Sequence, residues 1–331
     1  MSFKHFALAA SLCAIALPTV AEDRPVLDIY TYDSFAAEWG PGPALKAGFE
    51  KICGCTVDYV TAVDAISMLR KVQLEGATSP ADVVVGLDTA TSGEARATGL
   101  FADHGADTSG LVFWPAWSDA QFIPFDYGYF AYVYNTEKTP NPPKSFEELI
   151  ALPSSFKIVI EDPRSSTPGL GNVYWIAAAY GDRAPEIWAG LKPHILTVTR
   201  GWSEAYGLFL NGEADMVLSY TTSPAYHVIA ENDTRYAYAP FKEGHVQQIE
   251  LAGALASSNQ PELARQFLQY LMTPEAQTLI STTNWMYPVT DIGDALPDAF
   301  PPQPHVFIAV SEDMIAANGR AWVDAALAAL Q

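Results

Sequence analysis

Basic residues, cysteine and long apolar segments are all scarce in this sequence. Lysine and arginine together number 18 against 38 aspartate and glutamate residues, which gives a formal net charge of −20. Phosphodiester backbones and anionic lipid repel so acidic a protein, which argues against nucleic-acid binding and against binding at a membrane surface. A small cation, in contrast, would be attracted.

Only one apolar run is long, and it lies at the N-terminus. Lys4 and His5 precede an apolar stretch over 6–17, and Thr19-Val20-Ala21 follows as a small-residue cleavage site. This arrangement is typical of a secretory signal peptide, and no later stretch approaches the ~20 apolar residues that a membrane span needs. Cys13 follows Leu12, where a lipoprotein signal has a small residue. We therefore expect removal of residues 1–21 and export as a soluble protein.

Two of the three cysteines, Cys53 and Cys55, would remain in the mature chain. In an oxidising compartment such a pair has two interpretations. The functional one is a redox pair or a nucleophile, and the structural one is a local disulfide or two inert thiols. Gly54 suits the residue that follows a helix end, and no histidine or third cysteine lies nearby in sequence. The pattern favours a structural role, without a metal site.

Sequence motifs of catalysis are also missing. The chain has no H-E-x-x-H, no G-x-S-x-G, no Walker phosphate loop and no dinucleotide-binding G-x-G-x-x-G, and its six histidines are scattered. These absences do not exclude an enzyme but leave it unsupported, and we expect a protein that is not an enzyme, with no catalytic residue and no cofactor.

Strand and helix patterns alternate along the whole chain, which indicates an α/β fold with mostly parallel sheets. At 331 residues, 49% of them hydrophobic, the chain is long enough for two lobes. An aromatic-rich segment over 121–135 and a long strand over 246–256 would pass between them. We predict a first lobe from 22–124 and 250–284, and a second from 125–249 and 285–331.

Most of five aromatic residues map to the ends of predicted strands, and the edge formed by strand ends is where open α/β sheets bind ligands. Converging aromatic faces bind a cation or a flat heterocycle. Each ring taken singly could equally fill a core, but their concentration predicts that at least three line a cleft. The residues are Tyr32, Trp202, Tyr220, Tyr226 and Trp285.

Two helix starts carry polar residues with two possible roles. The segment 162–171 leads from a strand into Ser165, Ser166 and Thr167, and then into a Pro-Gly helix start. Its hydroxyls and free amides would hold an anion such as phosphate, or Ser166 or Thr167 would only cap the helix. Asp64 is expected to cap its own helix and, secondarily, to contact the ligand.

Several long, collinear segments resemble the thiamine-binding periplasmic proteins of bacterial thiamine ABC transporters. The similarity extends from the end of the signal to about residue 288 and includes the Cys-x-Cys pair. It is carried by residues 30–43 (YTYDSFAAEWGPGP), 124–131 (PFDYGYFA), 162–171 (DPRSSTPGLG), 201–210 (GWSEAYGLFL), 218–227 (LSYTTSPAYH) and 284–288 (NWMYP).

This resemblance implies a type II periplasmic-binding-protein fold, with thiamine or its phosphates in a cleft between two α/β lobes. It implies a periplasmic monomer that delivers its ligand to the membrane permease and ATPase subunits of an ABC transporter. Ala65 follows Asp64 where the family often has glycine, which weakens the Asp64 assignment. The matching ligand-binding positions are Tyr32, Asp64, Ser166, Trp202, Tyr220, Tyr226 and Trp285.

Two alternatives remain open at this point. Type II proteins of similar organisation bind ferric iron or other small solutes, although Tyr220 is followed by Thr221-Thr222 rather than by a second tyrosine. Thiamine-degrading transferases also resemble this fold, but they need a nucleophilic cysteine in the cleft. Only Cys53 and Cys55 are available for that role.

Overall fold

The computed structural model describes residues 24–113 and 116–331. The expected signal peptide at 1–21 lies outside the described residues. Among the helices that are described, none combines the length and the apolar character needed to cross a bilayer.

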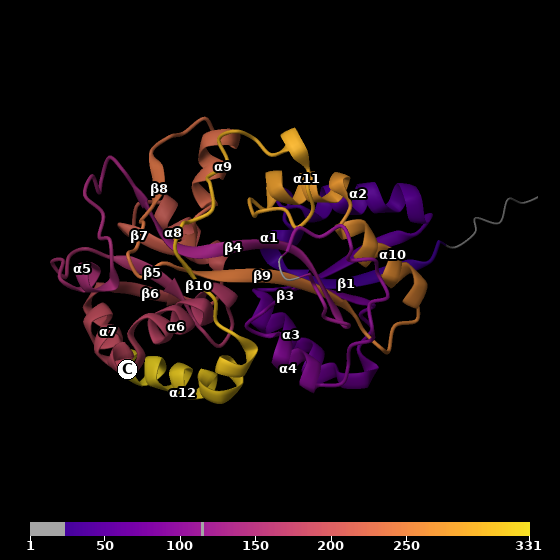
Figure 1. The fold of residues 1–331 in the computed structure, drawn as a ribbon, viewed down its shortest axis with the longest axis horizontal. Helices are drawn as coiled ribbons and strands as arrows, with labels where there is room; N and C mark the ends of the chain where they lie inside the picture. The colour runs from indigo at the N-terminus through magenta and orange to yellow at the C-terminus, as the bar shows by residue number, and fades with distance from the viewer. Residues whose placement is uncertain (1–23, 114–115) are drawn as a thin grey trace, which may run out of the picture.

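In the described part of the chain, ten strands form one sheet that extends through both halves of the molecule (Figure 1). Its main order is β2-β1-β3-β9-β4-β7-β5-β6, with β8 paired to β4 and β10 to β9. The strands are β1 (Val26–Tyr32), β2 (Thr56–Ala62), β3 (Val83–Asp88), β4 (Phe122–Asn135), β5 (Ile158–Glu161), β6 (Ile195–Thr199), β7 (Met216–Tyr220), β8 (Tyr236–Tyr238), β9 (His245–Ala254) and β10 (Phe307–Ile308).

One half of the molecule, called the first lobe here, is built around β1, β2 and β3. Phe35, Phe49, Phe125 and Phe267 pack together in its core. Its helices are α1 (Asp33–Ala36), α2 (Gly42–Cys53), α3 (Ala65–Glu75), α4 (Ser92–Ala97), α10 (Pro261–Leu271) and α11 (Pro274–Thr283), with a 3₁₀ turn η1 at Gly76–Thr78.

The second lobe is built around β5, β6 and β7. Its core contains Tyr132, Phe146, Trp175 and Phe241. Its helices are α5 (Phe146–Ile150), α6 (Thr167–Tyr180), α7 (Ala184–Leu191), α8 (Trp202–Leu210), α9 (Ser223–Ala230) and α12 (Glu312–Leu330), and its 3₁₀ turns are η2 (Gly181–Arg183) and η3 (Lys192–His194). A further turn, η4 (Gly293–Ala295), lies in the segment that follows α11.

The two lobes are joined by β4 and β9, which lie side by side in the middle of Figure 1. As expected, the aromatic-rich segment passes from one lobe to the other, and it does so as a single long strand that pairs with β9 and continues beside β7 and β8. The predicted lobe boundaries at 124/125 and 249/250 fall within β4 and β9, and 284/285 lies just after α11. The boundaries themselves stay a prediction.

The sheet is mixed, whereas the sequence predicted mostly parallel pairing. Within each lobe the pairs β1/β2, β1/β3, β5/β6 and β5/β7 are parallel, because helices connect consecutive strands. The pairs β3/β9, β4/β9 and β4/β7 are antiparallel. The antiparallel pairs all involve the two connecting strands, which carry the chain from one lobe to the other and back.

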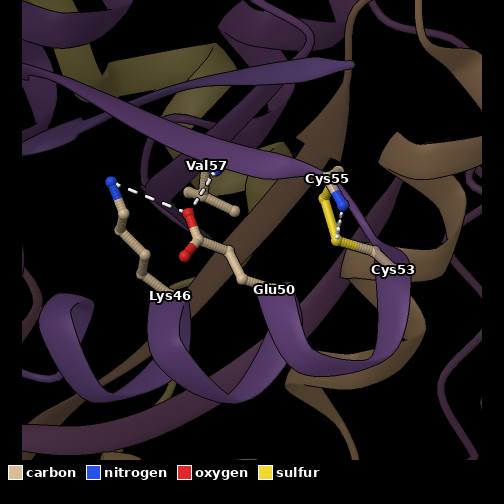
Figure 2. Close-up of a disulfide and its surroundings, with 5 residues drawn as sticks. All are labelled: Lys46, Glu50, Cys53, Cys55 and Val57. Atoms are coloured by element: carbon tan, nitrogen blue, oxygen red, sulfur yellow. Dashed lines mark hydrogen bonds and ion pairs between the residues drawn. A yellow bond between two sulfur atoms is a disulfide. The ribbon is translucent and has the colours of Figure 1, made fainter. Parts of the chain in front are cut away.

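The Cys53–Cys55 pair forms a disulfide at the end of α2 (Figure 2). Gly54 adopts φ +64°, the left-handed conformation predicted for the residue after the helix. Glu50, one turn earlier, accepts a 2.8 Å hydrogen bond from the backbone N–H of Val57 and so ties α2 to β2. These contacts support a structural role for the disulfide.

Candidate functional site

A cavity of about 340 Å³ lies between the two lobes. The first lobe contributes the end of β1 and the start of α3, and the second contributes the starts of α6 and α8 and the end of β7. Glu250 of β9 and residues 283–286 after α11 complete the lining. The volume suits one small molecule, and a cavity between lobes is a common place for a ligand.

Aromatic side chains dominate this cavity. All five aromatic residues predicted from the strand ends line it, namely Tyr32, Trp202, Tyr220, Tyr226 and Trp285. The indole of Trp202 stacks on Tyr206 with ring centroids 4.9 Å apart, and Tyr226 meets Trp285 edge-on at 5.8 Å. The cavity therefore presents aromatic faces from both lobes, and we call these five residues the aromatic cluster.

Backbone geometry helps to place one of these rings. Trp285 adopts φ +58°, a left-handed conformation that is uncommon for a residue with a Cβ atom. It directly follows Asn284, the residue after α11, and its side chain lines the cavity. Strained positions of this kind concentrate at ligand sites.

Asp64 is buried and joins three helix starts. As predicted, it caps α3, since its Oδ1 accepts a 2.7 Å hydrogen bond from Ala65 N–H. The same carboxylate reaches the other lobe, where Oδ1 accepts from Thr167 N–H at 3.3 Å and Oδ2 accepts from Trp202 N–H at 3.2 Å. Burial raises the pKa of Asp64 to about 6, although these hydrogen bonds oppose the shift.

Ser166 is placed differently from its expected role. Its side chain is fully buried and donates a 2.7 Å hydrogen bond to Asp64 Oδ2, and it is not among the residues that line the cavity. It stands at the cap position of α6 without making a cap hydrogen bond. Thr167 and Pro168 line the cavity instead. The Ser166 hydroxyl is thus bonded to Asp64 of the opposite lobe. The sequence around Ser166 gives no sign of this distant partner.

The start of α8 near Ser203 also depends on the opposite lobe. Helix α8 begins at Trp202 with Gly201 in the cap position, and the Ser203 hydroxyl donates to Asp33 Oδ1 of the first lobe at 3.0 Å. Because Asp64 accepts from Trp202 N–H, a side chain from the opposite lobe satisfies this helix start. The structure therefore shows the lobes in direct contact around the cavity.

The sequence interpretation missed several lining residues. Trp39 lies 6.3 Å from the Trp202 ring and is more than half exposed, so it stands at the mouth of the cavity. It belongs to the quoted segment 30–43, which offered a signal for it. Glu250 also lines the cavity although it is only 7% exposed. A lone acid inside the otherwise apolar segment 249–256 (IELAGALA) is the signal that could have revealed it.

Charges around the cavity are of one sign. Among the described residues that line it, Asp33, Asp64 and Glu250 are acidic and none is lysine, arginine or histidine. Burial and the nearby Asp126 carboxyl raise the pKa of Glu250 well above its usual value. Aromatic faces favour a positively charged ligand, and such a ligand would in turn favour the ionised form of these carboxyl groups.

Known proteins match the chain over nearly all of its length. The family model of bacterial extracellular solute-binding proteins matches residues 44–292. The chain belongs to this family.

The relatives are named for the solute they bind. The thiamine-binding periplasmic protein of Salmonella typhimurium is 48% identical over 94% of this chain and 95% of its own, and that of Brucella abortus is 47% identical over 95% of each. A solved structure described as a periplasmic thiamin binding protein superimposes with a TM-score of 0.91 at 46% identity, covering 96% of this chain and 99% of the other. The resemblance and the type II two-lobe fold expected from the sequence are confirmed.

Neither alternative function is favoured by these findings. The relatives are named as binding proteins for a vitamin, in agreement with the expectation of a protein that is not an enzyme. Cys53 and Cys55 are bonded to each other and do not belong to the described lining of the cavity, where a transferase would need its nucleophile. Within the described residues, no group of three or more His, Cys, Asp or Glu side chains is placed to hold a metal ion.

Proposed function

We propose that this protein captures thiamine in the periplasm and delivers it to an ABC transporter for import, without a cofactor. The observation that carries the proposal is the cavity between the lobes, lined by the aromatic cluster and by acidic side chains. Thiamine joins a flat aminopyrimidine to a permanently charged thiazolium. The pyrimidine stacks between rings, and the thiazolium gains a cation–π attraction of about 0.5–2 kcal/mol per ring.

The relatives support the same ligand, because those at 47–48% identity are named as thiamine-binding proteins. The net charge of −20 supports rapid capture, since a negative field raises the association rate of a cation. Thiamine phosphates are proposed as further ligands. Their phosphate would find neutral hydroxyl groups in the cavity, at Ser34, Thr167, Ser203, Thr222 and Ser223.

Delivery would depend on lobe closure. Residues of both lobes surround the cavity, so a bound ligand bridges them and favours the closed arrangement, as in other hinge-type binding proteins. The closed surface is what the permease and ATPase subunits would recognise. We propose that the exported, soluble protein acts as a monomer.

Native mass spectrometry of the freshly purified protein tests this function. We expect a carried-over ligand whose mass equals that of thiamine or a thiamine phosphate, at one molecule per chain. A protein that carries no such ligand, does not take up added thiamine, and develops a charge-transfer band with Fe(III) would be a ferric-ion receptor. Turnover of thiamine with an added base co-substrate would instead indicate a transferase.

A further inference from the structure

Three acidic residues lie side by side at the level where the connecting strands leave the first lobe. Glu250 of β9 is in register with Asp88 of β3 on one side and with Asp126 of β4 on the other. All three are nearly completely buried, and Glu250 is the one that lines the cavity. A row of buried carboxyl groups is costly, so a requirement other than packing must account for it.

The Glu250 carboxyl is held in place by neutral groups. The Tyr32 hydroxyl donates to its Oε2 at 2.7 Å, and Gln248 Nε2 donates to its Oε1 at 3.2 Å. Asn284 Nδ2 bonds both the Tyr32 hydroxyl, at 3.2 Å, and Asp126 Oδ2, at 2.7 Å. These bonds fix the orientation of an acceptor and bring no positive charge to it.

Spare accepting capacity remains on this carboxyl. Beside a bound cation, which favours the ionised form, each oxygen of this carboxyl has two lone pairs, and the described residues donate one hydrogen bond to each oxygen. The Tyr32 ring, which belongs to the aromatic cluster, is attached to the same carboxyl through its hydroxyl. A flat ligand stacked on that cluster would therefore bring its edge toward Glu250.

We propose that Glu250 is a specificity-determining residue, which accepts a hydrogen bond from the exocyclic amine of an amino-substituted heterocycle. This inference rests on the proposed function, in which the ligand is thiamine and the amine is that of its aminopyrimidine. If a carbonyl oxygen replaced the amine, two hydrogen-bond acceptors, this oxygen and the Glu250 carboxyl, would face each other with no donor between them. In a buried site such an unmade hydrogen bond strongly disfavours the wrong ligand.

Comparison of thiamine with oxythiamine, in which a carbonyl replaces the amine, tests this role. Titration calorimetry of the wild-type protein should show a preference for thiamine of at least tenfold. In Glu250→Gln the side-chain amide can donate to the carbonyl, so the preference should fall at least fivefold. The matched control Glu213→Gln also removes one negative charge, but at an exposed loop position, and should keep the wild-type ratio.

Each outcome decides the matter. Equal affinities of the wild-type protein for both compounds would overturn the inference even if Glu250→Gln failed to fold. An unchanged ratio in Glu250→Gln, with both affinities weakened alike, would assign Glu250 the structural role of anchoring Tyr32 and would also overturn it. A wild-type protein that binds neither compound would instead overturn the proposed function itself.

Discussion

The Asp64 carboxylate of the first lobe accepts a hydrogen bond from the backbone N–H of Trp202 in the second, with Oδ2 and N 3.2 Å apart. The same side chain accepts from Ser166 and Thr167, also in the second lobe. One buried group therefore connects the lobes at the rim of the cavity, and these contacts require the lobes to lie this close together. Ligand affinity and the geometry of Asp64 should be coupled for this reason.

Asp64→Asn tests that coupling. An asparagine has one accepting oxygen, so one or two of the three cross-lobe hydrogen bonds are lost, depending on which way the amide turns. Destabilising the closed form lowers apparent affinity, and we expect thiamine binding to weaken at least tenfold, or about 1.4 kcal/mol. Calorimetry provides the measurement, with Asp58→Asn on an exposed position of β2 as the control. Equal thiamine affinity in Asp64→Asn and the wild type would show that the Asp64 hydrogen bonds do not contribute to lobe closure.

Removing an indole from the aromatic cluster should weaken binding directly. Trp202→Ala and Trp285→Ala each remove a stacking surface of the cavity, and we expect at least a tenfold loss of thiamine affinity in either. Phe307→Ala, which truncates a half-exposed ring of β10, should bind thiamine like the wild type. Unchanged calorimetric affinity in both tryptophan variants would eliminate the aromatic cluster as the binding surface.

Stability should decrease between pH 5 and pH 8 because buried carboxyls must ionise. Burial raises the pKa of Asp88 to about 6 in the folded protein, against about 3.9 in an unfolded chain. At pH values between these two pKa values, Asp88 holds more protons in the folded state than in the unfolded chain. Its contribution to the free energy of unfolding is therefore fully present below pH 4 and is lost as the pH rises through 6.

Urea unfolding from pH 5 to pH 8 measures this effect. The wild type should lose about 1 kcal/mol more than Asp88→Asn over that range, because the asparagine does not titrate. Asp103→Asn, at an exposed position, should behave like the wild type. An identical pH dependence in Asp88→Asn and wild type would contradict the assigned shift.

The disulfide should contribute to stability and not to binding. A bridge that closes so short a loop constrains the unfolded chain little, and its loss should lower the free energy of unfolding by about 1–2 kcal/mol. The double variant Cys53→Ser/Cys55→Ser should keep its thiamine affinity, because neither residue belongs to the described lining of the cavity. Denaturation and calorimetry on the same sample test both statements. A large loss of thiamine affinity in the double variant would show instead that the disulfide affects the ligand-binding cavity.

Much of the fold follows from local sequence patterns. The Pro-Gly start of α6 and the left-handed Gly54 depend on neighbouring residues, and the structure has both as predicted. The aromatic cluster could also be predicted, because side chains at the ends of parallel strands share one edge of a sheet. Tyr32 and Tyr220 lie at strand ends in the structure, whereas Trp202 begins α8, Tyr226 lies in α9 and Trp285 follows α11.

The remaining site residues depend on contacts between lobes. Ser166 and Ser203 look like helix caps locally, yet their hydroxyls bond Asp64 and Asp33 of the opposite lobe. The role of Glu250 depends on its register with two other strands. Partners 100 or more residues apart leave no local pattern, so these assignments required the three-dimensional structure.

Titration of the purified, ligand-free protein with thiamine tests the central claim most directly. A cavity of aromatic faces and carboxyl groups should bind one thiamine per chain with a dissociation constant below about 1 μM. Calorimetry that detects no binding of thiamine or its phosphates, at a protein concentration where such an affinity is measurable, would contradict the account.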